Sequence, residues 1–137
     1  MKKIVSLSII ALFVSGCHFA RKTPDSDEMF TKAAALKRLA ATVESAVQYG
    51  DVPPQLQNAE LLALATEHNP KLLDGFAPYT LKAKNSNKHS SVLMCDPEGK
   101  HALIEDSGCT GQVDVLHWQQ APLPPCEFTL QLESVCD

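Results

Sequence analysis

The first half of the chain carries a helical pattern of apolar residues. Between Asp25 and Gly50 they recur at spacings of three and four, which places them on one face of an α-helix. Asp25, followed three residues later by Glu28, is typical of a helix start, and Gly50 of a helix end. We therefore predict an amphipathic helix whose buried stripe consists of Met29, Ala33, Leu36, Ala40, Val43 and Val47.

A second, shorter helix is predicted after the break at Pro53-Pro54. Because proline cannot continue a helix, this segment is bounded by those two residues and by Asn69-Pro70. One side of it carries Leu56, Ala59, Leu62 and Ala63. Residues 71–74 have room for one further turn before Gly75.

After Phe76 the pattern changes to alternation with a period of two, which indicates half-buried strands. We predict strands at 79–84, 90–95 and 101–105, with Asp96-Pro97-Glu98-Gly99 as the second turn. A fourth strand is expected over 126–136, because Cys126, Phe128, Leu130, Leu132, Ser134 and Cys136 alternate with polar residues. The fold class is therefore α+β: two N-terminal helices (26–75) packed on a small antiparallel sheet of about four strands (76–137).

Four cysteines fall in the last third of the chain: Cys95, Cys109, Cys126 and Cys136. An even number favours two disulfides, whereas a structural zinc site usually has close Cys-x-x-Cys pairs, and this chain has none. In an extended strand Cys126 and Cys136 would lie ~33 Å apart, which is too far for a bond. A meander would start its last strand near Cys109 and run back toward Cys95, so we predict the pairs Cys109–Cys126 and Cys95–Cys136.

The N-terminus indicates export. Lys2 and Lys3 precede an apolar run of eleven residues, Ile4 to Val14. A membrane-spanning helix needs about 20 apolar residues, so this run fits the core of a signal peptide instead.

The four residues that complete this segment, Val14-Ser15-Gly16-Cys17, resemble the lipobox of bacterial lipoproteins. The resemblance implies cleavage after Gly16, a diacylglycerol on the Cys17 sulfur, and a lipidated tether over 17–25. Because His18 rather than Asp follows the cysteine, it further implies the outer membrane, with the single domain of residues 26–137 facing the periplasm.

The charge balance agrees with attachment through lipid. The whole chain has 12 basic and 16 acidic residues, a net charge of −4, and removal of residues 1–16 takes away two lysines and leaves 10 − 16 = −6. An acidic domain is not attracted to anionic headgroups. The same charge argues against nucleic acid as a partner.

Candidate chemistry is sparse. The five histidines have no metal-ligand spacing, and we predict neither a metal site nor a cofactor. Glu105, Asp106 and Asp114 could form a carboxylate cluster with His117, the basis of an alternative hypothesis of a small envelope hydrolase.

The loop 110–125 is the candidate binding element, because it carries the single tryptophan on a proline-rich backbone. Its proposed contact residues are Leu116, His117 and Trp118; alternatively, Trp118 covers the sheet. The leading functional hypothesis is a non-catalytic, lipid-anchored accessory protein of the bacterial envelope, with a pilotin-like, assembly or inhibitor role and an envelope protein as partner.

Overall fold

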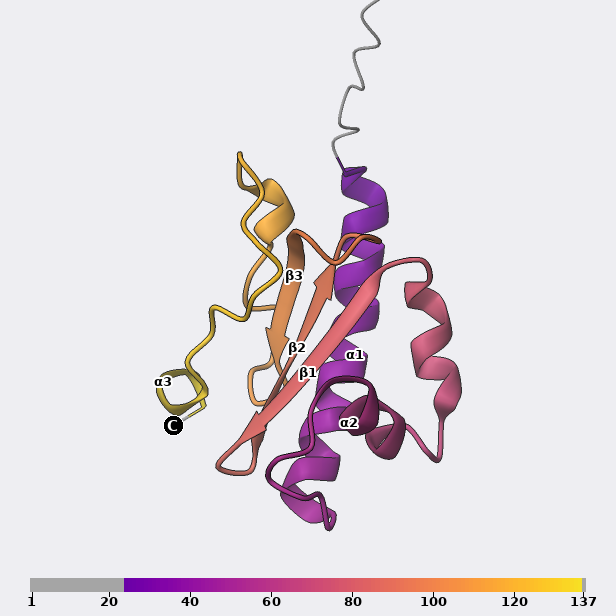
Figure 1. The fold of residues 1–137 in the computed structure, drawn as a ribbon, viewed down its shortest axis with the longest axis vertical. Coiled ribbons are helices and arrows are strands. Elements are labelled where there is room, and N and C mark those ends of the chain that lie inside the picture. Colours follow the sequence, from indigo (N-terminus) through magenta and orange to yellow (C-terminus); the bar gives the residue numbers. More distant parts are fainter. Residues whose placement is uncertain (1–23, 137) are drawn as a thin grey trace, which may run out of the picture.

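The computed structural model describes residues 24–136, and the predicted signal segment, the predicted lipobox and most of the predicted tether lie outside this range. The helical elements are α1 (Ser26–Tyr49), α2 (Asn58–Ala65), η1 (Pro70–Phe76), η2 (His117–Gln119) and α3 (Leu132–Val135). The strands are β1 (Thr80–Ser86), β2 (His89–Cys95) and β3 (Ala102–Ser107), as Figure 1 shows. The predicted α+β class is confirmed.

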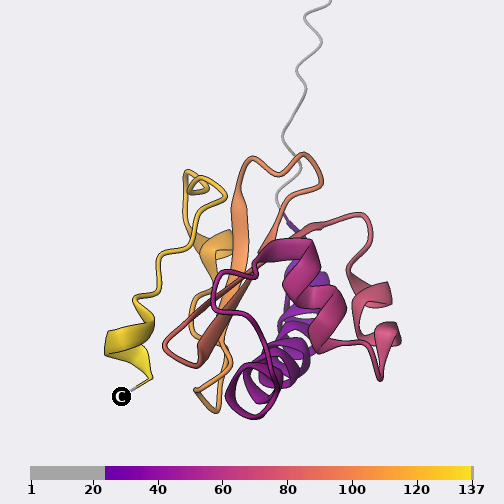
Figure 2. The same ribbon diagram turned by 60° about the horizontal axis from the view of Figure 1, so that its bottom comes forward.

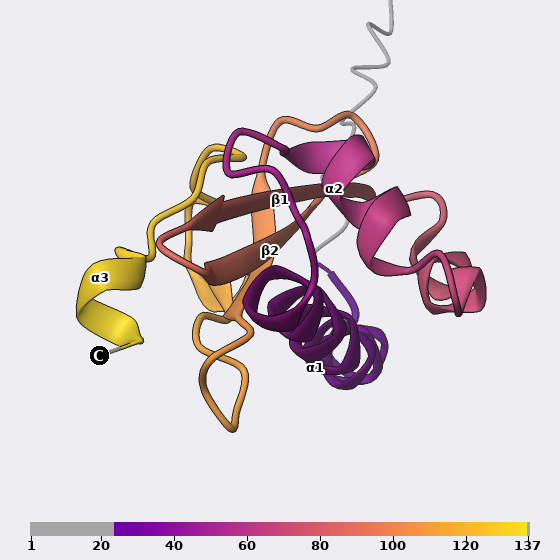
Figure 3. The ribbon, with the colours of Figure 1, turned by 90° about the horizontal axis from the view of Figure 1, so that it is seen from below.

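Helix α1 packs along one face of the sheet, and the C-terminal segment lies on the other side (Figures 2 and 3). All six residues of the predicted α1 stripe are buried, and the structure adds Leu39 and Glu44 to the buried set. The Asp25 side chain accepts a hydrogen bond from the Asp27 backbone N–H at 3.0 Å, so Asp25 is the N-cap as expected.

The predicted face of the second helix is partly wrong. α2 starts only at Asn58, so Leu56 lies in the preceding loop, and Ala59 and Ala63 are exposed. Leu61 and Leu62 are the buried pair, because the short helix is oriented by its packing against β1 and α1 rather than by its own weak amphipathic pattern.

The strands form an antiparallel sheet in the order β1-β2-β3. The β1–β2 turn is made by Asn87 and Lys88, both with positive φ (51° and 63°). In the β2–β3 turn Gly99 has φ 69°, in agreement with the turn predicted there.

The predicted fourth strand is wrong. Residues 126–131 form no strand, and residues 132–135 are the helix α3, so three strands are present in the part of the chain that the structure describes. The free edge of β3 is instead bridged by single residues of the 110–125 loop, at Glu105–Val115 and His101–Pro125. Residues after Cys126 therefore cross the face of the sheet rather than extend its edge.

This path also corrects the disulfide pairing. The bonds are Cys95–Cys126 and Cys109–Cys136, with Cα–Cα distances of 5.7 and 5.5 Å. The 110–125 loop itself returns along β3 to the β2–β3 turn, where the Cys126 backbone N–H donates to the Lys100 carbonyl. Cys126 thus arrives beside Cys95, and the following residues carry Cys136 back to Cys109. The number of disulfides is as predicted, and only their partners differ.

Candidate functional site

Glu105 lies at the centre of the predicted carboxylate cluster and is completely buried. Its Oε1 accepts hydrogen bonds from the backbone N–H groups of Thr129 (3.0 Å) and Leu130 (2.9 Å). Its Oε2 accepts from Thr129 Oγ1 (2.8 Å) and from His117 Nε2 (2.9 Å). Both oxygens are therefore committed to holding the C-terminal segment and η2 on the sheet.

His117 is almost as inaccessible as Glu105, with 2% of its surface exposed. Its second ring nitrogen, Nδ1, accepts a long hydrogen bond of 3.4 Å from Gln120 Nε2. Both ring nitrogens are hydrogen-bonded to protein groups. His117 therefore connects η2 to β3.

Asp106 and Asp114 form a separate pair. Asp106 is paired with Val92 in the β2–β3 register, which places its side chain on the α1 face, opposite to Glu105. Burial, together with a hydrogen bond to the Asp114 carboxylate, raises the pKa of Asp106 to about 8. Below that pKa the Asp106 carboxyl is neutral and can donate to Asp114, whereas its own Oδ1 is buried without a hydrogen-bond partner.

Asp114 is ionised for reasons that the structure makes clear. Burial by itself would raise its pKa, but the hydrogen bonds that its carboxylate receives from Asp106, Ser107 and Thr110 outweigh this and lower the pKa. Ser107 N, Ser107 Oγ and Thr110 Oγ1 all donate to Asp114 Oδ2, at 2.8, 2.8 and 2.9 Å. The four residues of the hydrolase hypothesis therefore fall into two groups on opposite faces of the sheet.

The predicted binding loop lies against the domain. Leu116 and Trp118 are half-buried and pack against the main core. His117, between them, is buried and hydrogen-bonded to Glu105. The Trp118 ring meets Phe30 of α1 edge to face, with centroids 5.5 Å apart and an interplanar angle of 88°. Trp118 thus covers part of the core and also borders solvent, while its role as a contact residue stays a prediction.

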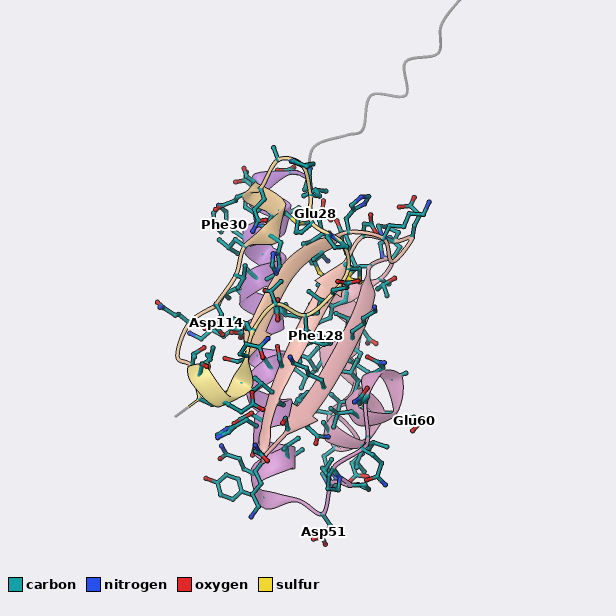
Figure 4. All side chains as sticks on the ribbon, turned by 60° about the vertical axis from the view of Figure 1, so that its left-hand side comes forward. Glu28, Phe30, Asp51, Glu60, Asp114 and Phe128 are labelled. Atoms are coloured by element: carbon teal, nitrogen blue, oxygen red, sulfur yellow. A yellow bond between two sulfur atoms is a disulfide. The ribbon has the colours of Figure 1, made fainter. Side chains whose placement is uncertain are left out.

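Phe30 is the residue that the sequence pattern missed. It follows the buried Met29, lies off the helical stripe, and is 53% exposed. Figure 4 shows it near the start of α1, at the end of the molecule opposite to Asp51. The only available signal was a large apolar residue at a position that the helical period assigns to solvent.

A second buried carboxylate organises the start of β2. Glu44 of α1 accepts hydrogen bonds from Ser90 N (2.6 Å) and Ser90 Oγ (2.8 Å) through Oε2, and from His89 Nδ1 (2.7 Å) through Oε1. His89 in turn lies beside Cys109 and Cys136, the one group in the described range with the ligand atoms to hold a metal ion.

No helix within residues 24–136 has the length and apolar character needed to cross a membrane. Comparisons with protein-family models, with curated protein sequences and with solved structures found no match for this chain.

Proposed function

We propose that this protein is a bacterial envelope lipoprotein, anchored through Cys17, whose domain acts as a non-catalytic accessory protein with an envelope protein as its partner. One observation carries the proposal: Cys17 lies three residues after the end of a signal-like apolar run and precedes the N-cap of α1, Asp25, by eight residues. A lipobox is expected in such a place, between a leader and the start of a folded domain.

The tether limits where the domain lies. Eight residues span at most about 28 Å when fully extended. The start of α1 is then the end nearest the bilayer, and the end that carries Asp51 is the far one (Figures 1 and 4). Phe30 is exposed at the near end, beside Trp118.

An accessory role is supported by how the polar residues are used. Glu105 and His117 have little or no exposed surface, and their hydrogen bonds are made to other groups of the protein. Phe30 and Trp118 instead offer a rigid aromatic pair at the surface, the residue type that contributes most to protein–protein contacts. We assign the partner contact to this pair.

The anchor is tested by labelling cells with a radioactive fatty acid. Wild-type protein and a His18→Ala control should take up label, and Cys17→Ser should not, because its hydroxyl is not the nucleophile that accepts the lipid. Label on the Cys17→Ser protein, or none on the wild type, would contradict lipid attachment.

The partner contact is tested by co-purification from detergent-solubilised envelopes. Phe30→Ala should reduce recovery of the partner at least ~10-fold, because an aromatic anchor contributes about 2 kcal/mol or more. Tyr49→Ala is the matched control, since Tyr49 is also exposed (85%) but ends α1. Equal recovery with Phe30→Ala and wild type would contradict this assignment.

A further inference from the structure

Three side chains from separate parts of the chain meet where β2 begins: His89, Cys109 and Cys136. A ring nitrogen of His89 and the two sulfurs all lie within 4.8 Å of one another, and all three residues are half-buried. In the oxidised chain the two sulfurs are bonded to each other. Imidazole and thiolate are the ligands that Zn²⁺ prefers in proteins.

His89 has the carboxylate partner that a metal-binding histidine usually has. Its Nδ1 donates to Glu44 Oε1 at 2.7 Å, so the neutral ring carries its lone pair on Nε2. Glu44 itself is only 5% exposed and is held by Ser90. A carboxylate that fixes the second ring nitrogen is the usual support of a zinc-binding histidine.

The two disulfides differ in access. Cys95 is fully buried and Cys126 is 6% exposed, whereas Cys109 and Cys136 are both half-buried. Thiol–disulfide exchange requires the attacking thiolate to reach a sulfur atom. A dithiol reductant therefore reaches the Cys109–Cys136 bond first.

The C-terminal segment is also held by contacts that do not depend on that bond, so we expect it to stay in place after cleavage. Glu105 still accepts hydrogen bonds from the backbone of Thr129 and Leu130, and Leu132 remains buried at 2% exposure. The Cys95–Cys126 bond holds the other end of the same segment. The two new thiols therefore stay close to His89.

We propose that reduction of the Cys109–Cys136 disulfide creates a site for a thiophilic divalent cation such as Zn²⁺, with both sulfurs and His89 Nε2 as ligands. The S–S bond breaks as the dithiol supplies two electrons and two protons and becomes a disulfide itself. Cation binding then displaces one proton from each thiol, and water takes the fourth position. Two thiolates balance the charge of the cation.

The dimensions fit such a site. With Zn–S distances of about 2.3 Å and a Zn–N distance of about 2.0 Å, the ligand atoms of a tetrahedral site lie ~3.5–3.8 Å apart. A ring nitrogen of His89 lies within 4.8 Å of both sulfurs, and reduction frees the two sulfurs to separate, so side-chain rotations can bring the three ligand atoms to this spacing. This inference does not depend on the lipid anchor or on the partner contact.

The test uses Co²⁺ as a spectroscopic probe and then Zn²⁺. The oxidised chain is reduced with limiting dithiol until thiol counting and peptide mapping show Cys109 and Cys136 free, and the reductant is then removed without air. We expect one Co²⁺ per chain, with sulfur-to-cobalt charge-transfer absorption that Zn²⁺ abolishes. The oxidised chain should bind at least ~100-fold more weakly.

Two variants separate ligation from folding. His89→Gln keeps a donor for Glu44 but removes the imidazole, and it should weaken Co²⁺ binding at least ~10-fold. His101→Ala is the matched control, because His101 is also half-buried and donates to a carboxylate, Asp96, at 2.8 Å. Its binding should be unchanged.

The proposal is overturned if the reduced wild type binds Co²⁺ no better than the oxidised chain, or if His89→Gln binds like the wild type. Circular dichroism of the reduced chain gives an independent check. Loss of the native spectrum on reduction would also overturn it, because the site requires the C-terminal segment to stay on the sheet.

Discussion

Glu105 is a single side chain that connects three parts of the protein. From β3 it binds η2 through His117 and the C-terminal segment through Thr129 and Leu130. A buried carboxylate is tolerated only when its hydrogen bonds are complete, and this one accepts from Thr129 N, Thr129 Oγ1, Leu130 N and His117 Nε2. Its role is thus structural, although the sequence suggested an acid of a catalytic cluster.

Substitution of Glu105 should therefore affect stability strongly. Glu105→Gln keeps the volume but turns an amide N–H₂ toward N–H donors, and we expect the free energy of unfolding to fall by ~3 kcal/mol or more. Urea unfolding measures this loss. Glu127→Gln, an exposed acid of the same segment, is the control and should stay within about 0.5 kcal/mol of wild type; an equally small effect at Glu105 would contradict the structural role.

The raised pKa of Asp106 makes the free energy of unfolding depend on pH. Its pKa is about 8 in the folded protein and 3.8 in the unfolded chain, so the folded state binds the extra proton between these values. Its contribution to stability is complete below pH 3.8 and declines as pH rises toward about 8. The limiting slope for one proton is about 1.4 kcal/mol per pH unit, and we expect a smaller one because solvent reaches Asp114.

Asp106→Asn removes this titration and keeps a donor for Asp114. Chemical unfolding between pH 5 and pH 8 should show a weaker decline for Asp106→Asn than for wild type. Glu60→Gln, at an exposed position of α2, should leave the wild-type profile unchanged. Parallel profiles for Asp106→Asn and wild type would refute the assignment.

At the scale of elements, the approach of the β3 end to α1 requires a glycine. A Cβ atom at Gly108 would overlap the Glu44 Cβ and the Ala40 carbonyl oxygen, and neither atom can move without shifting α1. The same close approach lets Glu44 reach Ser90. This glycine therefore sets the distance between helix and sheet.

Gly108→Ala should destabilise the protein by ~1–3 kcal/mol through overpacking. Gly111→Ala, three residues further along the same loop, is a matched control because a Cβ atom added there would meet nothing within 4 Å. We expect no loss of stability there. Thermal unfolding of both variants checks the difference, and equal transition temperatures would contradict the tight contact.

The elements also show what local pattern can predict. The stripe of α1 was recovered because helical periodicity depends only on neighbouring residues. The buried face of α2 was harder to predict. Its eight residues have little amphipathic contrast, so the helix takes its orientation from the elements that it packs against. The strand predicted over residues 126–136 was wrong for the same reason. The backbone of this segment donates hydrogen bonds to Glu105 and does not pair with a strand.

For the whole molecule, the two disulfides close loops of similar size, with sequence separations of 31 and 27. Chain entropy alone then gives each about 3.6 kcal/mol. The Cys95–Cys126 bond is also packed among buried side chains of the second core, including Leu93 and Ala102. The two bonds should therefore differ in their total effect.

We expect the double variant Cys95→Ala/Cys126→Ala to lose more stability than Cys109→Ala/Cys136→Ala, by the added cost of a cavity in the core. Urea unfolding of both double variants measures this. Peptide mapping of the non-reduced wild type, with cleavage at Asp96, Asp114 and Glu127, verifies the pairing. A disulfide-linked peptide that joins Cys95 to Cys136 would contradict this pairing and support the predicted four-stranded sheet.

The amino-acid sequence by itself determined the elements whose signals are local. These are α1 with its cap, the turn between β2 and β3, the α+β class and the presence of two disulfides. Only the tertiary structure decided which cysteines pair, where residues 110–136 run, and which polar groups meet. The physical reason is that contacts between Glu105 and Thr129, or between His89 and Cys136, depend on packing over long separations, and no local periodicity records them.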